Sequence, residues 1–351
     1  MEERIIRTVM EDEDMLQGAI DRIRDAGGRV ELSVGDHRIY RGLRIDSPCV
    51  RLSGGVWSYS SDPNGVFESY YGSKLRLMAD VPAVEIGFTH TTEGLLLQDF
   101  GVQGNIDGMD TRPFLTESGT EGGTGLYFNH TRADQAEFSK LTFCGLGAAV
   151  KIDKGAEIDA CTFEKLNTDG CAVGVWFSPR AAYYPSFRKI LFADNPYYGF
   201  YADGTDTGLH NLQVIDNLFI RDGGAFTEEM AWEPAAVYWK NIDNSLIRDN
   251  LFDCIGTFWY FAERKAANAH HETVMRNTAG LIVRGNHNRI INNVFTNSGG
   301  DAIRIYGDGN VLHGNIADSD VIIEGRNNQV KDMIFTSESA HLYINGEIVP
   351  V

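Results

Sequence analysis

The sequence predicts an all-β fold: a right-handed parallel β-helix (solenoid) that follows a short N-terminal capping helix. Three observations lead to this prediction. Helical periodicity is confined to the first residues, short apolar β runs fill the remainder, and a polar-then-apolar anchor recurs along most of the chain. A recurring unit that cannot bury its own apolar face is typical of a solenoid, because stacked neighbours then build a continuous core.

The first expected element is an amphipathic helix over residues 13–26. Its apolar side chains recur at helical spacing, and the pair Gly27-Gly28 ends it. Short β runs begin directly afterwards, so a helix here would cover the otherwise exposed end of a coil of strands. We therefore expect residues 1–28 to form a helical cap. The apolar stripe comprises Met15, Leu16, Ala19, Ile20 and Ile23.

The repeat consists of one or two polar residues followed by an apolar pair. Neighbouring anchors are separated by as few as 19 residues, from Ile316 to Phe335, and by as many as 43, from Phe252 to Phe295. The shortest intervals resemble one another, and the longer ones indicate the same unit with inserted loops. The anchors end at Phe143, Phe163, Phe192, Phe219, Phe252, Phe295, Ile316 and Phe335.

Stacked coils would bury a shared column of Phe, Ile and Val, while Asn and Gly make the corners. The pairs Asn292-Asn293 and Asn327-Asn328 and the single Asn250 predict ladders of identical side chains on successive coils. Side-chain amides stacked in this way would bond to one another along the solenoid.

We expect residues 29–351 to form one β-helix domain. Two polar stretches, near residues 103–125 and 263–280, are expected to be loops inserted into it. Long loops on a rigid scaffold often carry binding sites, and a plain solvated loop is the alternative.

The charge balance narrows the class of partner. Among 351 residues, 49 are acidic and 31 are basic, which gives a net charge of −18. This charge opposes binding to nucleic acid or to an anionic membrane, and it argues mildly against polyuronates, whose carboxylates call for a basic cleft. We expect a neutral substrate, no nucleic-acid partner and no membrane contact.

The sequence shows no motif that supports a metal site, a cofactor site or covalent catalysis. The five cysteines are odd in number and lack CxxC spacing, and the pair His270-His271 has no HExxH motif beside it. We therefore expect buried free thiols, no metal and no organic cofactor. The charged first residues lack the apolar core of a signal peptide, which predicts a cytoplasmic protein; a secreted protein whose leader has been removed is the alternative.

Two carboxylates are candidates for acid–base catalysis. Asp222 follows an apolar run and precedes a glycine pair, a polar turn in which it would stay ionised. Glu233 lies between Trp232 and Pro234, whose bulky, poorly hydrating surface favours a protonated carboxyl. An acid and a base beside one glycosidic bond would then be available. Solvated surface carboxylates are the simpler interpretation in so acidic a chain.

Aromatic residues gather between residues 176 and 260, and strand alternation predicts that about half of them point outward. An outward aromatic file suits stacking against sugar rings, while core or subunit contacts account for the others. A further aromatic segment, residues 57–72, is a candidate lid. The side chains that we expect to bind substrate are Trp57, Tyr59, Arg180, Tyr201, Trp232, Trp239 and Arg304.

Several long stretches resemble the inulin fructotransferases and the related difructose dianhydride hydrolases. The resemblance covers most of the chain from about residue 40 to residue 240, and generic β-helix texture dominates the last third. The stretches that carry it are GLRIDSPCVRLSGGVWSYSSDPNGVFES, GMDTRPF, RADQAEFSKLTFCGLGAAV, EIDACTFEKLNTDGC and ADNPYYGFY, followed by the Asp222 and Glu233 pair.

This resemblance implies a homotrimer of parallel β-helices with active sites between subunits. The two essential acids of the family lie eleven residues apart, the interval between Asp222 and Glu233 here. Family members release a difructose dianhydride, III or I, from β-2,1 fructan by intramolecular fructosyl transfer, or they hydrolyse the dianhydride to inulobiose. The sequence does not assign the acid and base roles, and neither reaction needs a cofactor.

Three alternatives remain open. A cytoplasmic enzyme would not meet polymeric inulin, which favours hydrolysis of an imported dianhydride. A non-catalytic, glycan-binding β-helix would use the aromatic face without the acid pair. Another β-helix lyase would need a cation to neutralise a uronate carboxylate, for which Arg304 is the candidate.

Overall fold

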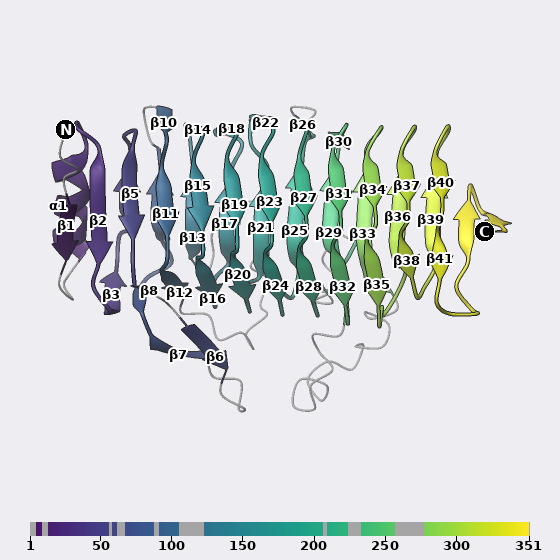
Figure 1. Ribbon diagram of the computed structural model, residues 1–351, viewed down its shortest axis with the longest axis horizontal. Helices are drawn as coiled ribbons and strands as arrows, with labels where there is room; N and C mark the ends of the chain where they lie inside the picture. Colours follow the sequence, from purple (N-terminus) through teal and green to yellow (C-terminus); the bar gives the residue numbers. More distant parts are fainter. Residues whose placement is uncertain are drawn as a thin grey trace. The chain divides into compact units, whose positions relative to one another are not determined.

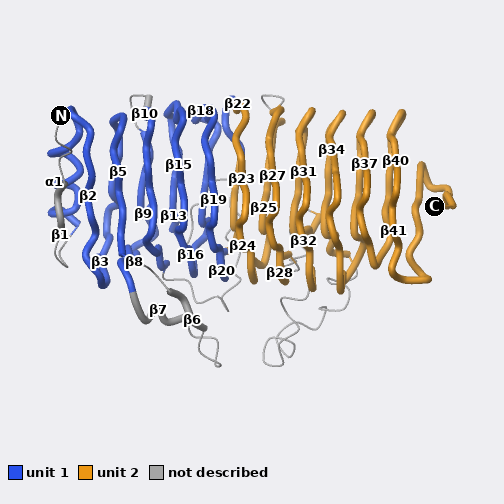
Figure 2. Tube along the Cα trace, in the orientation of Figure 1, with its two compact units in different colours: residues 1–171, 178–181 blue, residues 172–177, 182–351 orange. Residues whose placement is uncertain are grey.

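The computed structural model describes residues 5–8, 13–55, 58–61, 67–87, 91–104, 123–205, 209–223, 233–256 and 277–350. These residues form parallel β-sheets with a single helix among them, which confirms the predicted β-helix (Figure 1). They divide into two compact units (Figure 2). Unit 1 comprises residues 1–171 and 178–181, and unit 2 comprises residues 172–177 and 182–351.

Each unit carries three parallel sheets, called A, B and C in the order in which the chain enters them. In unit 1, sheet A contains β1 (Ile5–Thr8), β2 (Gly28–Leu32), β5 (Val50–Ser53), β11 (Leu96–Gln98), β15 (Glu137–Ser139) and β19 (Thr162–Glu164). Sheet B contains β3 (Gly35–Ile39), β8 (Ser73–Leu77), β12 (Gly101–Gln103), β16 (Thr142–Cys144) and β20 (Asn167–Asp169). Sheet C contains β4 (Leu43–Ile45), β9 (Pro82–Ile86), β13 (Thr124–Phe128) and β17 (Ala148–Ile152).

In unit 2, sheet A contains β23 (Ser186–Arg188), β27 (Gln213–Ile215), β31 (Leu246–Arg248), β34 (Arg289–Ile291), β37 (Val311–His313) and β40 (Gln329–Lys331). Sheet B contains β24 (Leu191–Ala193), β28 (Leu218–Ile220), β32 (Leu251–Asp253), β35 (Val294–Thr296), β38 (Ile316–Ala317) and β41 (Ile334–Phe335). Sheet C contains β21 (Val173–Phe177), β25 (Tyr198–Asp203), β29 (Ala235–Lys240), β33 (Ala279–Arg284), β36 (Ile303–Tyr306), β39 (Val321–Glu324), β42 (Leu342–Ile344) and the antiparallel β43 (Glu347–Val349).

Shorter strands lie outside these sheets. They are the hairpin β6 (Ser58–Ser61) and β7 (Phe67–Tyr71), the parallel pair β26 (Leu209–His210) and β30 (Ile242–Asp243), the small sheet β10 (Thr91–Glu93), β14 (Arg132–Asp134) and β18 (Glu157–Asp159), and β22 (Ala181–Tyr183).

Helix α1 (Glu13–Ile23) is the amphipathic helix expected from the sequence, but it ends three residues earlier than Ala26. Its buried stripe is narrower than expected, since Met15 is 52% exposed. Met15 lies about 100° around the helix from Leu16, which places it beside the buried face. The carboxylate of Glu13 accepts hydrogen bonds from the backbone N–H groups of Tyr40 and Arg41, so it ties the start of α1 to the chain after β3.

A column of stacked phenylalanines fills the core of unit 2. The rings of Phe192, Phe219, Phe252 and Phe295 lie in successive strands of sheet B, with centroids 4.5, 4.8 and 4.4 Å apart. All four side chains are fully buried. These four anchors therefore mark one position of successive coils, whereas the predicted anchor Ile316 is displaced by one residue, since it pairs with Val294.

The expected equivalence of Phe163 with these anchors is wrong. Phe163 lies in sheet A, where it stacks on Phe138 at 4.8 Å, whereas Phe143 lies in sheet B. Phenylalanine occupies both positions five residues apart in one coil, at Phe138 and Phe143, so aligning on aromatic residues alone confuses the two sheets.

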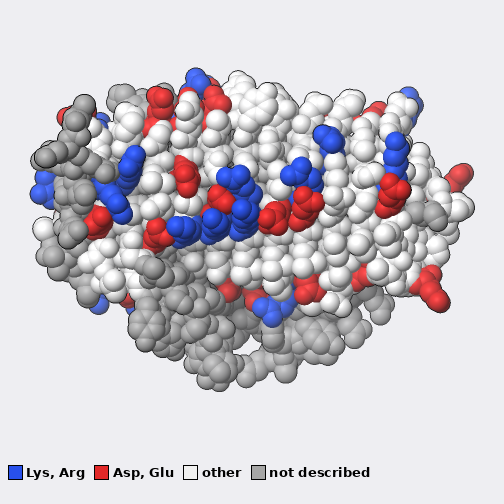
Figure 3. Space-filling view, viewed as in Figure 1, with Lys and Arg blue, Asp and Glu red and all other residues white. Residues whose placement is uncertain are grey.

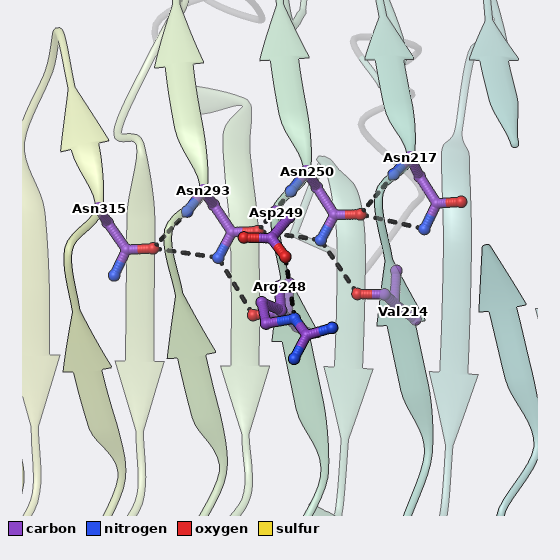
Figure 4. A network of polar contacts seen from close by, with 8 residues as sticks. Val214, Asn217, Arg248, Asp249, Asn250, Asn293 and Asn315 are labelled. Atoms are coloured by element: carbon purple, nitrogen blue, oxygen red, sulfur yellow. Dashed lines mark hydrogen bonds and ion pairs between the residues drawn. The ribbon is translucent and has the colours of Figure 1, made fainter. Parts of the chain in front are cut away.

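Four successive corners between sheets A and B in unit 2 combine two features. The residue that leaves sheet A has positive φ, as at Asp216 and Asp249, and the next residue is an inward-facing asparagine. Figure 4 shows the resulting ladder in unit 2, in which each side-chain oxygen accepts from the backbone and side-chain N–H groups of the preceding asparagine. The predicted ladder is thus present. Its members are Asn217, Asn250, Asn293 and Asn315.

Candidate active site

The outer surface of sheet C in unit 2 carries an aromatic file. Phe200 and Val237 are buried in the core, so the next residues, Tyr201 and Tyr238, project from the opposite side of their strands. Trp176 pairs in register with Tyr201, and their ring centroids are 4.5 Å apart. The Tyr201 and Tyr238 rings stack at 5.8 Å, 12° from parallel. Tyr201 is only 6% exposed, whereas Trp176 and Tyr238 are half-buried, so these two rings carry the aromatic surface of the kind that binds sugar rings.

Three charged side chains and one tyrosine form a second file two residues further along the same strands. Asp203, Lys240, Arg284 and Tyr306 are paired in register across β25, β29, β33 and β36. Asp203 Oδ2 accepts from the Tyr201 hydroxyl and from Lys240 Nζ, both at 3.2 Å. Although burial opposes it, hydrogen bonding from Thr205 together with the Lys240 charge lowers the pKa of Asp203.

Glu233 lies directly before β29 and joins this second file. Arg284 Nη2 donates to Glu233 Oε2 at 2.5 Å, and the Tyr198 hydroxyl donates to the Glu233 carbonyl at 3.0 Å. The Glu233 side chain is 34% exposed, so its carboxylate is open to solvent and to a ligand. Burial raises the pKa values of the Tyr198 and Tyr238 hydroxyls, which keeps them protonated near neutral pH.

Asp222 occupies a different environment, at the corner that leaves sheet B. Its side chain is fully buried, and Oδ1 accepts from Asn195 N at 3.0 Å and from Asn195 Nδ2 at 2.8 Å. Asn217 donates to Asn250 through the same two groups, so Asp222 has the contacts of a ladder residue. Asp222 thus sits where the solenoid itself fixes the side chain.

Both predicted acids approach the start of β25. A Cβ on Gly199 would lie only 2.8 Å from Asp222 Oδ2, and the preceding residue, Tyr198, bonds to the Glu233 backbone. Glu233 therefore lies close to the strand against which Asp222 packs. Its contact with this strand is through its backbone carbonyl, whereas Asp222 lies on the core side, where Gly199 also faces Phe219.

The predicted binding residues fall into separate places. Tyr201 belongs to the aromatic file and Arg304 to the same register column, where Arg304 Nε contacts Asp301 Oδ2 at 2.7 Å. Trp239 instead points into the core and is fully buried, because it alternates with the outward Tyr238. Arg180 belongs to unit 1, where it is exposed and pairs with Glu157. The side chains of three others lie outside the described residues, namely Trp57, Tyr59 and Trp232.

Sequence reasoning missed Arg284 and the Asp203–Lys240 pair. The signal was present in AAVYWK and AGLIVR, where a charge ends an otherwise apolar strand. Only the coil register shows that Arg284 lies beside Glu233, since the two residues are 51 positions apart.

Two further expectations concern metals and charge. His270-His271 and most of both expected loop insertions lie outside the described residues, and within the described part no three metal-ligating side chains gather.

The face seen in Figure 3 carries both signs of charge side by side. In unit 2, Arg221 pairs with Asp194 at 2.6 Å and Arg248 with Asp249 at 2.9 Å. None of the helices described has the length and apolar character needed to cross a membrane.

Comparison with known proteins identifies solved structures that share the fold. No protein-family model and no curated protein matches the sequence. Among solved structures, DFA-IIIase from Arthrobacter chlorophenolicus A6 without its lid superposes with a TM-score of 0.69 at 17% identity, over 96% of this chain and 89% of that one. Its mutant C387A in complex with DFA-III gives 0.67 at 16% identity, over 95% and 82%.

A third solved structure, Geobacillus virus E2 ORF18, gives a TM-score of 0.57 at 14% identity over 95% of this chain. This chain spans only 58% of that viral protein. Together the three structures establish the class: a parallel β-helix protein. The DFA-IIIase structures share this fold with it, in agreement with the resemblance expected from the sequence.

Proposed function

We propose that this chain is an inulin fructotransferase-like enzyme. It would cleave β-2,1 fructan by intramolecular fructosyl transfer and release a difructose dianhydride, III or I. One observation carries the proposal: Glu233, paired with Arg284, lies beside an aromatic file on the outer surface of sheet C, and its carbonyl accepts from Tyr198 of β25, the strand against which Asp222 packs from the core side. The fold is also that of DFA-IIIase structures that hold DFA-III and GF2.

The chemistry needs one proton donor and one proton acceptor. The donor protonates the departing glycosidic oxygen, and the acceptor takes the proton of the attacking hydroxyl on the adjacent fructosyl unit. Asp222 and Glu233 would fill these two roles. A hydroxyl already held beside the anomeric carbon reacts at high effective concentration, so a site that excludes water favours cyclisation.

Hydrolysis of a difructose dianhydride to inulobiose is the second candidate. It uses the same pair of acids, with water in place of the attacking hydroxyl. Hydrolysis remains a candidate because a protein with this fold has been solved in complex with DFA-III. A uronate lyase fits less well, because the cation that it would need, Arg304, is engaged by Asp301.

The test is incubation of the protein with inulin, DFA-III and GF2, followed by chromatography. Release of a dianhydride from inulin supports transfer, and inulobiose from DFA-III supports hydrolysis. An inactive protein that still binds these sugars would point to a glycan-binding β-helix. We also propose a homotrimer with active sites between subunits, which light scattering on the purified protein would test.

A further inference from the structure

Arg284 is held on three sides at the end of β33. Its Nη2 donates to Glu233 Oε2 at 2.5 Å, and its Nε donates to the Tyr238 hydroxyl oxygen at 3.2 Å. Its Cζ lies 4.1 Å from the centroid of the Tyr306 ring, a cation–π contact. The guanidinium therefore has a carboxylate, a phenol and an aromatic face as fixed neighbours.

These contacts constrain two potential reacting groups at once. The ion pair engages Glu233 as a carboxylate, with one oxygen directed at the guanidinium. Arginine only donates hydrogen bonds, so the Tyr238 oxygen is the acceptor in its contact with Arg284. The Tyr238 hydroxyl proton must then point to another acceptor. Burial raises the pKa of Tyr238 and so keeps that proton in place.

We propose that Arg284 is the positioning residue of this site, holding Glu233 as the proton acceptor and directing the Tyr238 hydroxyl proton toward the bound sugar. The inference rests on the proposed function and assigns a role that the sequence left open. Asp222 is then the donor of the pair. Tyr306 supports the arrangement, because its ring fixes the plane of the guanidinium.

The proton balance is complete with these groups. The attacking hydroxyl gives its proton to Glu233 as its oxygen bonds to the anomeric carbon. The bond from that carbon to the glycosidic oxygen breaks, and the leaving oxygen takes the proton of Asp222. A protonated Glu233 no longer forms an ion pair with Arg284, which favours return of the proton to solvent or to Asp222 before the next turnover.

Titratable side chains from four neighbouring strands surround Glu233. Its described titratable neighbours are Arg284 on β33, Tyr238 on β29, Tyr198 on β25 and Tyr306 on β36. Arg284 is the cation that contacts Glu233 directly. Lys240 acts on Tyr238, and Arg304 and Glu324 act on Tyr306.

The experiment compares Arg284→Gln and Arg284→Lys with the wild type. For Arg284→Gln we expect kcat to fall by about 100-fold, the loss of one positioned catalytic group, with little change in KM. Arg284→Lys should restore only part of kcat, since lysine lacks the planar fork.

One variant serves as the control. Arg289→Gln removes an exposed arginine from β34 and should match the wild type in kcat and KM.

The outcomes separate the two claims. A wild-type protein inactive on inulin, DFA-III and GF2 would overturn the proposed function and this role with it. An active wild type whose Arg284→Gln variant keeps the same kcat would overturn the role of Arg284 alone.

Discussion

Replacing Asp222 by alanine and by asparagine separates its structural role from its proposed chemical one. The buried Oδ1 accepts two hydrogen bonds from Asn195, at 3.0 and 2.8 Å. Alanine would leave both donors buried without this acceptor, at about 1–3 kcal/mol each, so Asp222→Ala should lower the free energy of unfolding by roughly 4 kcal/mol. Asparagine keeps an oxygen for Asn195, as Asn250 does for Asn217, and should cost less than about 1 kcal/mol.

The assays are urea unfolding followed by circular dichroism, and turnover of inulin and DFA-III. Asparagine cannot donate a proton as a carboxylic acid does, so Asp222→Asn should fold normally and lose about 100-fold or more in kcat. An Asp222→Asn protein as unstable as Asp222→Ala would refute the ladder account. One that folds normally and keeps wild-type turnover would refute the catalytic role.

Three further predictions concern stability. Gly199→Ala would place a Cβ 2.8 Å from the Phe219 ring and should lower the free energy of unfolding in urea by about 1–3 kcal/mol. Gly18→Ala, in open space on α1, should raise it by up to about 1 kcal/mol. Equal effects of the two substitutions would contradict this reasoning. Asn250→Ala removes four ladder hydrogen bonds, each worth about 1 kcal/mol net, and a loss below about 1 kcal/mol would speak against the ladder. Because the pKa of Asp203 is lowered by folding, this residue stabilises the folded state fully above the unfolded-state pKa of about 3.9, and the stabilisation is lost as pH falls through the folded-state pKa. The difference in free energy of unfolding between wild type and Asp203→Asn should therefore shrink below about pH 4. A difference that does not change with pH would exclude this linkage.

The fold was predictable from sequence because its repeat is written in residue types. The phenylalanines that stack at 4.4–4.8 Å recur in the sequence after similar polar residues. The asparagines at the corners form a hydrogen-bonded ladder, as expected for identical residues on successive coils. The assignment of Phe163 failed for a physical reason. Sheets A and B both bury an aromatic residue in a three-residue strand, so residue type alone does not distinguish them.

The site was predictable only where it is local in sequence. Asp222 and Glu233 lie on one segment, and their interval could be matched to a family pattern. Trp239 was assigned to the wrong face because its neighbour Tyr238 is also aromatic, and a run of aromatic residues hides the alternation. Arg284 could not be found, because its link to Glu233 depends on the length of the intervening coil.

That dependence on coil length explains how the fold supports the chemistry. The corner ladders fix the register of unit 2 from within, through buried bonds such as Asn250 to Asn293 at 2.9 Å. The same register aligns Lys240, Arg284 and Tyr306 on the outer surface, since residues paired across parallel strands share a face. A shift of one residue in β33 would turn Arg284 inward and bring an apolar neighbour to Glu233. The inner asparagines and the outer charges are therefore parts of one constraint, in which buried amides determine which side chains lie beside Glu233.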